Sequence, residues 1–137
     1  MKPAHQESGQ AVVEYALTAL IFFSLLLFTV DGGRIFWNYL TVTEAARVGA
    51  RYGITHGANS AAPVSPSDYA ALRQTIIDKT AGLVPADLTV TATWTPNNQP
   101  GSKITVDLAY IVRPITSMFW SAQSLTLRAR STMVIQN

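Results

Sequence analysis

The chain has 137 residues, enough for one membrane segment and one small domain. Its formal net charge of +2 and its scattered basic residues do not indicate nucleic-acid binding, since only Arg128 and Arg130 lie close together. It contains no cysteine, which excludes disulfide frameworks, thiol nucleophiles and thiolate metal sites.

The N-terminal region joins a short polar leader, residues 1–9, to a long apolar run. Residues 3–33 contain no lysine or arginine, so most of this region can enter a bilayer. A secretory signal would be cut after its apolar stretch at a small-x-small site, and residues 29–33 offer none. A cut between Gly9 and Gln10 would instead leave the apolar helix on the mature protein.

We expect residues 10–54 to form one long helix with its membrane-spanning part at about 11–30. The central run, 15–30, would be about 24 Å long, slightly short of a hydrocarbon core of about 30 Å, and flanking apolar residues extend it. The alternative is a buried helix of a soluble protein, but the rest of the chain is too small to surround it. The paired glycines Gly32 and Gly33 predict a bend.

Two acids flank the apolar run. A carboxylate within a membrane is costly, but Glu14 would lie in the first turn of the processed helix, where negative charge is favoured. In an oligomer it could pair with the new α-amino group at Gln10 of a neighbouring subunit. The alternative is a glutamate at the headgroup boundary. We expect Asp31 to mark the exit from the bilayer and to pair with Arg34, three residues on.

The second half of the helix carries a face of small residues that permits close backbone approach. It comprises Ala45, Ala46, Gly49 and Gly53. Such a face outside the membrane packs more often against its own domain, and lateral packing between subunits is the alternative.

We expect residues 55–66 to form a loop and residues 67–137 a small exported α+β domain. A helix should begin near Ser65–Ser67, because these serines can cap it and Pro66 suits an early position. It should end near Gly82.

Three apolar–polar alternations follow, at 88–94, 104–112 and 125–135, and predict a three-stranded antiparallel sheet with one solvated face. Residues 96–101 form a hairpin loop in this prediction. The segment Arg113–Ser124 carries Met118, Phe119 and Trp120, which either close the small core or contact a partner.

No catalytic motif is recognisable in the sequence. His5 falls in the leader, and His56 has no second metal ligand at helical or hairpin spacing. Neither a G-x-S-x-G element nor a phosphate-binding glycine loop is present. We therefore expect no enzyme activity, no cofactor, no metal and no small-molecule substrate.

The first 53 or so residues carry a combination of short motifs that resembles a known family. The motifs are G-Q-A-x-V-E-Y-A-L before the apolar run, D-G-G-R-x-F after it, and E-A-A-R-x-G-A-R-Y further on. The glycine followed by a glutamate at the fifth position resembles a class III prepilin signal. The whole combination resembles the TadE-type pseudopilins, minor subunits of tight-adherence (Flp, type IVc) pili. The matching residues are Gly9, Gln10, Ala11, Val13, Glu14, Tyr15, Asp31, Gly33, Arg34, Phe36, Ala45, Ala46, Arg47, Gly49, Ala50 and Arg51.

The resemblance implies a structural pilus subunit. It implies cleavage by a prepilin peptidase between Gly9 and Gln10 and assembly through Glu14 and Tyr15. It implies contacts with other pilin or pseudopilin subunits, the inner-membrane assembly platform and the lipid bilayer. The N-terminus would be cytoplasmic and the C-terminal domain exported from the inner membrane, with incorporation into an extracellular pilus that supports adhesion and biofilm formation. The alternative function is a single-pass membrane-anchored binding domain that never enters a filament.

Overall fold

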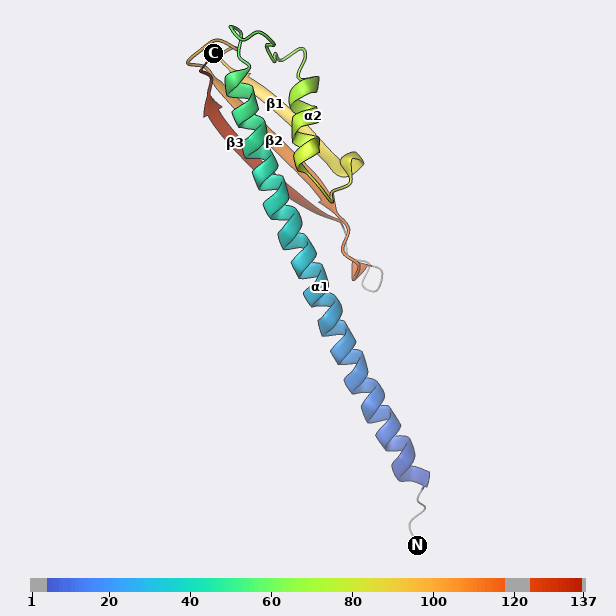
Figure 1. The fold of residues 1–137 in the computed structure, drawn as a ribbon. Helices are drawn as coiled ribbons and strands as arrows, with labels where there is room; N and C mark the ends of the chain where they lie inside the picture. The colour runs from blue at the N-terminus through green and yellow to red at the C-terminus, as the bar shows by residue number, and fades with distance from the viewer. Residues whose placement is uncertain (1–4, 118–123, 137) are drawn as a thin grey trace.

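The computed structural model describes residues 5–117 and 124–136 (Figure 1). The expected α+β fold is confirmed: a long N-terminal helix is followed by one short helix and a three-stranded antiparallel sheet. The predicted apolar segment at 113–124 lies partly outside the described residues, including its Met118, Phe119 and Trp120. The elements are α1 (His5–Thr55), α2 (Ala70–Lys79), a 3₁₀ helix η1 (Pro85–Asp87), and the strands β1 (Leu88–Thr95), β2 (Lys103–Val112) and β3 (Leu125–Val134).

Helix α1 is one continuous helix of 51 residues. The predicted bend at Gly32 and Gly33 is wrong, because the helix passes through both glycines without interruption (Figure 1). A Cβ added at either position would meet nothing within 4 Å, so no packing contact at these glycines bends the helix. Within the apolar run, hydroxyl groups donate to the carbonyl four residues earlier, as Thr18 does to Glu14 at 2.9 Å and Ser24 does to Leu20 at 2.7 Å. These bonds satisfy the polar groups inside the helix itself.

The sheet has the order β1-β2-β3, with both neighbouring pairs antiparallel. Its register places Leu88 opposite Tyr110 and Val112 opposite Leu125. Side chains on the central strand alternate between buried and less buried positions, so the sheet has one apolar face. The predicted alternation is therefore present in the structure.

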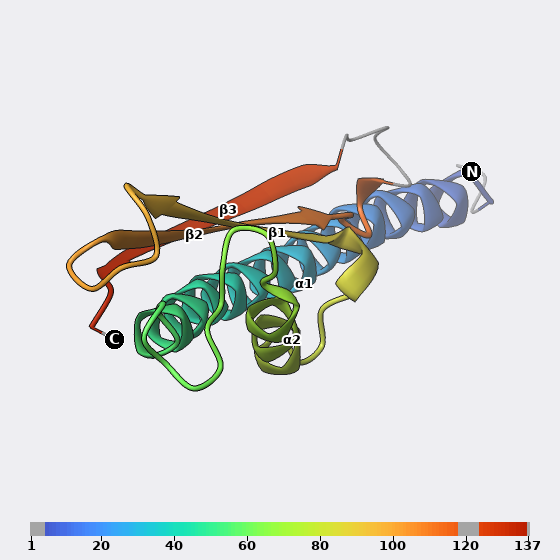
Figure 2. The same ribbon diagram turned by 90° about the horizontal axis from the view of Figure 1, so that it is seen from above.

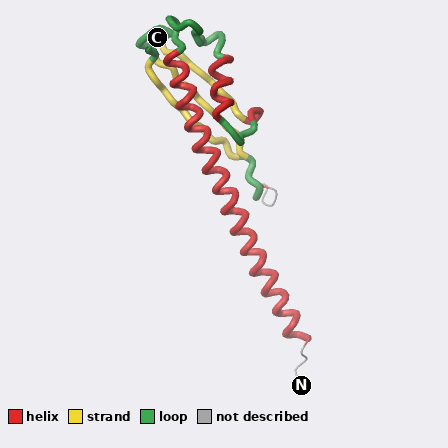
Figure 3. The backbone as a smooth tube through the Cα atoms, viewed as in Figure 1, coloured by secondary structure: helices red, strands yellow, loops and turns green. Residues whose placement is uncertain are grey.

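The C-terminal half of α1 and α2 both cover the apolar face of the sheet (Figure 2). The core between them contains the fully buried side chains of Val42, Leu72, Ile76, Ile104 and Val106. Figure 3 shows that the strands and α2 gather beside this half of α1, while the N-terminal half of the helix extends away from them. One helix therefore supplies both a core element and a long projecting segment.

Helix α2 begins later than predicted, at Ala70. Instead of capping the helix, the Ser65 hydroxyl accepts a bond from the Asp68 amide at 3.3 Å, within a turn that precedes it. The Asp68 carboxylate then accepts from the Ala70 amide at 3.2 Å. The helix ends at Lys79, and Gly82 in the following turn adopts φ +84°, which favours glycine.

Candidate assembly helix and its junction with the domain

The projecting half of α1 exposes apolar side chains all round. These are Val12, Val13, Tyr15, Leu17, Leu20, Ile21, Phe22, Phe23, Leu25, Leu26, Phe28 and Val30, and beyond the junction at Asp31 the same helix also exposes Phe36, Trp37, Tyr39 and Leu40. The helix is long and apolar enough to cross a membrane, with a mean hydropathy of 2.2 in its most apolar window, no part of which is buried. A helix that is apolar all round needs an apolar environment, and within this chain the domain does not supply one.

The predicted processing and assembly residues lie at the far end of this segment. Gly9 is inside α1, four residues after the first described helical residue, His5. Gln10 and Glu14 are exposed, and Tyr15 is 78% exposed. Glu14 has no ion pair within the described part of the chain. The single chain thus presents these residues together on the first turns of the helix and far from the domain.

Asp31 lies where the projecting segment meets the domain, and it is only 4% exposed. Its carboxylate accepts hydrogen bonds from the amide of Ile115 at 2.9 Å, the amide of Thr116 at 2.8 Å and the hydroxyl of Thr116 at 2.8 Å. Arg34 donates a further, longer bond of 3.4 Å. The pairing with Arg34 was predicted, but the three shorter bonds were not.

Asp31 therefore connects α1 to the segment that follows β2. The two partners are 84 and 85 residues away in the sequence, so no local pattern could have identified them. The one signal in the sequence was an acid directly after an apolar run. Such an acid needs other donors when it is buried.

A second ion pair, between Arg113 and Asp87, lies at the end of the domain next to Asp31. Arg113 follows β2 and donates to both carboxylate oxygens of Asp87 in η1, at 2.6 and 2.8 Å. These hydrogen bonds lower the pKa of Asp87 against the opposing effect of desolvation, and the Coulomb attraction lowers it further. The same pair raises the pKa of Arg113. The bidentate geometry fixes η1 against the end of β2.

The small-residue face packs inside the chain's own domain. Ala45 and Ala46 are buried at 0% and 1% exposure, and Gly49 and Gly53 are buried as well. A Cβ at Gly49 would lie 2.6 Å from the Cδ1 atom of Ile76 in α2. At Gly53 it would clash with Cδ1 of Ile104 in β2. The four residues thus let α1 approach α2 and the sheet, and in this structure they are not available to a neighbouring subunit.

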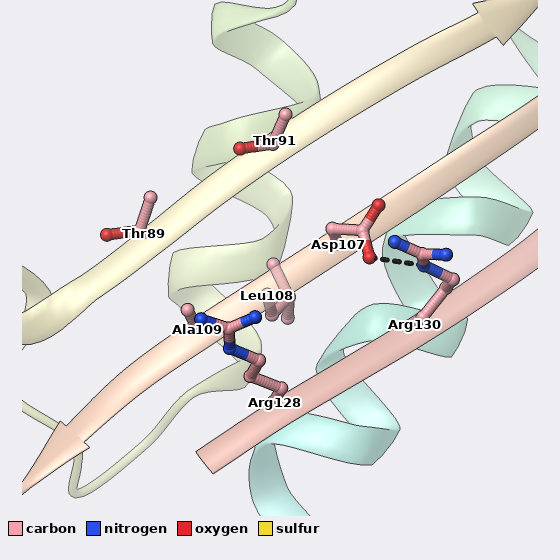
Figure 4. Close-up of a pocket in the computed structure, with 7 residues that line it drawn as sticks. All are labelled: Thr89, Thr91, Asp107, Leu108, Ala109, Arg128 and Arg130. Carbon is pink, nitrogen blue, oxygen red and sulfur yellow. Dashed lines mark hydrogen bonds and ion pairs between the residues drawn. The ribbon is translucent and has the colours of Figure 1, made fainter. Parts of the chain in front are cut away.

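The solvated face of the sheet carries a shallow open hollow of about 420 Å³ (Figure 4). Thr89 and Thr91 line one side, while Arg128 and Arg130 line the other. Arg130 donates to Asp107 at 2.6 Å. His56 lies elsewhere, where its ring stacks on Tyr52 with the centroids 3.9 Å apart. In the described part of the chain, no group of three or more potential ligands could hold a metal ion.

Comparison with known proteins finds one similarity, and it lies within α1. No curated protein and no solved structure matches this chain. Residues 9–51, which make up most of α1, match the family model described as TadE-like protein. This family supports a role associated with the Tad pilus, and one long apolar N-terminal helix fits a membrane anchor in such a protein. From Gly9 to Arg51, α1 is thus similar to the TadE-like family.

Proposed function

We propose that the chain is a minor pilin or pseudopilin subunit of a Tad (Flp, type IVc) pilus. The observation that carries the proposal is the division of α1 into two halves. One half belongs to the core of a small domain, and the other is exposed, apolar and ends in Gly9, Gln10 and Glu14. A subunit that assembles through a helix needs such a segment.

The proposed topology follows from the same division. The apolar half spans the inner membrane with a cytoplasmic N-terminus, and the domain lies on the exported side. A prepilin peptidase cuts between Gly9 and Gln10, after which other pilin subunits and the membrane assembly platform become the partners. The assembled pilus supports surface adhesion and biofilm formation.

The assembly step would use Glu14. This residue has no cationic partner among the described residues of its own chain. Cleavage would create an α-amino cation at Gln10, one turn away on the same helix. Pairing between the amine of one subunit and the Glu14 carboxylate of the next would leave neither charge alone in apolar surroundings.

Processing of a Gly9→Val variant tests the proposal. Valine carries a branched side chain, which hinders access of a peptidase to the backbone. The variant should stay at precursor mass when the membrane-extracted protein is measured intact, whereas the wild type should begin at Gln10. A Gly32→Val variant is the matched control, because this helical glycine is also free of neighbours within 4 Å. Maturation of Gly9→Val would contradict the assignment and favour a membrane-anchored domain that does not enter a filament.

A further inference from the structure

The segment 113–117, which follows β2 and is here named the Asp31 loop, reaches along α1 to the level of Asp31. Its position is fixed by the bonds from Ile115 and Thr116 to the Asp31 carboxylate. Asp31 comes directly after the apolar run that ends at Val30. Among the described residues of the domain, the Asp31 loop therefore lies beside the end of the apolar run on α1 (Figure 1).

The amides of residues 115–117 in this loop all have partners within the protein. Pro114 has no amide hydrogen. The amides of Ile115 and Thr116 donate to Asp31, and the Ser117 amide donates to the Pro114 carbonyl at 3.2 Å. The hydroxyls of Thr116 and Ser117 also donate within the loop and its junction, at 2.8 and 2.6 Å. Amides that are satisfied by protein lower the cost of bringing irregular backbone close to hydrocarbon.

The loop also presents an apolar side chain. Ile115 is 45% exposed although its amide is bonded to a buried carboxylate. The negative charge of Asp31 is covered, since this residue is only 4% exposed and accepts from three donors in the loop. The nearby helix residue Trp37 is 64% exposed, and tryptophan is favoured at membrane interfaces.

We propose that the Asp31 loop contacts the bilayer, with the Ile115 side chain against lipid at the membrane surface. The inference rests on the membrane-spanning role proposed for α1 and adds a second lipid contact, made by the domain. The occupant is lipid because the loop is bonded to Asp31, the residue directly after the exposed apolar run that ends at Val30. Because α1 runs unbroken into the core of the domain, the domain tilts together with the helix, and this contact would limit that tilt relative to the membrane.

Site-directed labelling of the full chain in phosphatidylcholine vesicles tests this contact. The protein has no cysteine, so single substitutions place one thiol each without other changes. The variants are Ile115→Cys, Val30→Cys and Val134→Cys, whose parent side chains are similarly exposed at 45%, 44% and 49%. Each thiol carries an environment-sensitive fluorophore, and quenching is measured with a lipid-borne spin label and with aqueous iodide.

The proposal predicts that the lipid-borne label quenches Ile115→Cys and Val30→Cys several-fold more than Val134→Cys. Val134 is the last residue of β3, whereas the first residue of this strand, Leu125, pairs with Val112 beside the Asp31 loop. If Ile115→Cys behaves like Val134→Cys while Val30→Cys is quenched, the loop contact is wrong and the membrane helix stands. If neither quencher reaches Ile115→Cys, protein covers it and the proposal fails. If Val30→Cys is not quenched by lipid, the membrane role of α1 fails as well.

Discussion

Asp31 and Thr116 are joined twice: the amide and the hydroxyl of Thr116 each donate to the same Asp31 oxygen at 2.8 Å. Asp31 lies in α1, and Thr116 lies between β2 and β3, 85 positions later in the sequence. Because Asp31 is also the first residue after the apolar run, this contact couples the membrane-compatible part of α1 to the fold of the domain.

Asp31→Ala should destabilise this junction. The change leaves the amides of Ile115 and Thr116 without an acceptor, and each unsatisfied buried donor costs about 1–3 kcal/mol. Denaturant unfolding of the detergent-solubilised chain measures the loss, and hydrogen exchange should speed up at those two amides. Asp107→Ala is the control, since its half-exposed pair with Arg130 should contribute little. Equal stability of the two variants would contradict the role assigned to Asp31.

Gly53→Ala should destabilise the domain, because the usual cost of overpacking a filled core, about 1–3 kcal/mol, exceeds the gain of about 0.5–1 kcal/mol from alanine in a helix interior. The added methyl would clash with Cδ1 of Ile104, while the Cγ1 and Cγ2 atoms of Ile104 lie at an ordinary 3.5 Å. Ile104→Val removes the clashing atom, so the double variant should be more stable than the sum of the single changes predicts. Unfolding free energies of all three variants provide this cycle.

Gly33→Ala is the matched control for Gly53→Ala. It lies in the same helix but has open space around it. Alanine is favoured over glycine in a helix interior by about 0.5–1 kcal/mol, so this variant should be neutral or slightly stabilised. Similar destabilisation at both glycines would show that helix geometry, and not the contact with Ile104, sets the cost.

The sequence predicted the elements well and their long-range contacts poorly. The alternation of apolar residues indicated the strands, and the small residues from Ala45 to Gly53 indicated a close approach. The identity of the approaching side chains, Ile76 and Ile104, depends on how the sheet and α2 fold back onto α1. The bend at Gly32–Gly33 was predicted from a local preference, but a continuous hydrogen-bonded helix tolerates exposed glycines when nothing packs against them.

The Asp87–Arg113 pair should make stability depend on pH at the acid end. Arg113 lowers the pKa of Asp87, so the pair contributes stability above the usual aspartate pKa of about 3.9. This contribution is lost as the pH falls through the lowered pKa of the folded state. The difference in melting temperature between wild type and Asp87→Asn should be small, constant from pH 7 to 5, and should shrink below about pH 4.

Arg113→Gln should show the same pH profile as Asp87→Asn, because either change removes the same pair. Melting curves recorded across this pH range for the three proteins make the comparison. If the melting temperature of the wild type differs from that of both variants by the same amount at every pH down to 3, the pair does not contribute to the acid dependence of stability.

Glu14→Ala should still insert and be cleaved but should assemble poorly. Without its carboxylate, the new α-amino group of the adjoining subunit would lie uncompensated in apolar surroundings. Glu14→Asp should be milder yet still harmful, since the shorter side chain draws the carboxylate away from the amine. Complementation of pilus formation in a deletion strain, with mature protein levels measured in parallel, provides the test. Glu44→Ala is the control, because this glutamate on the same helix forms only an exposed pair with Arg47 at 3.7 Å. Normal piliation by Glu14→Ala at normal abundance would leave Glu14 as an interfacial residue with no part in assembly.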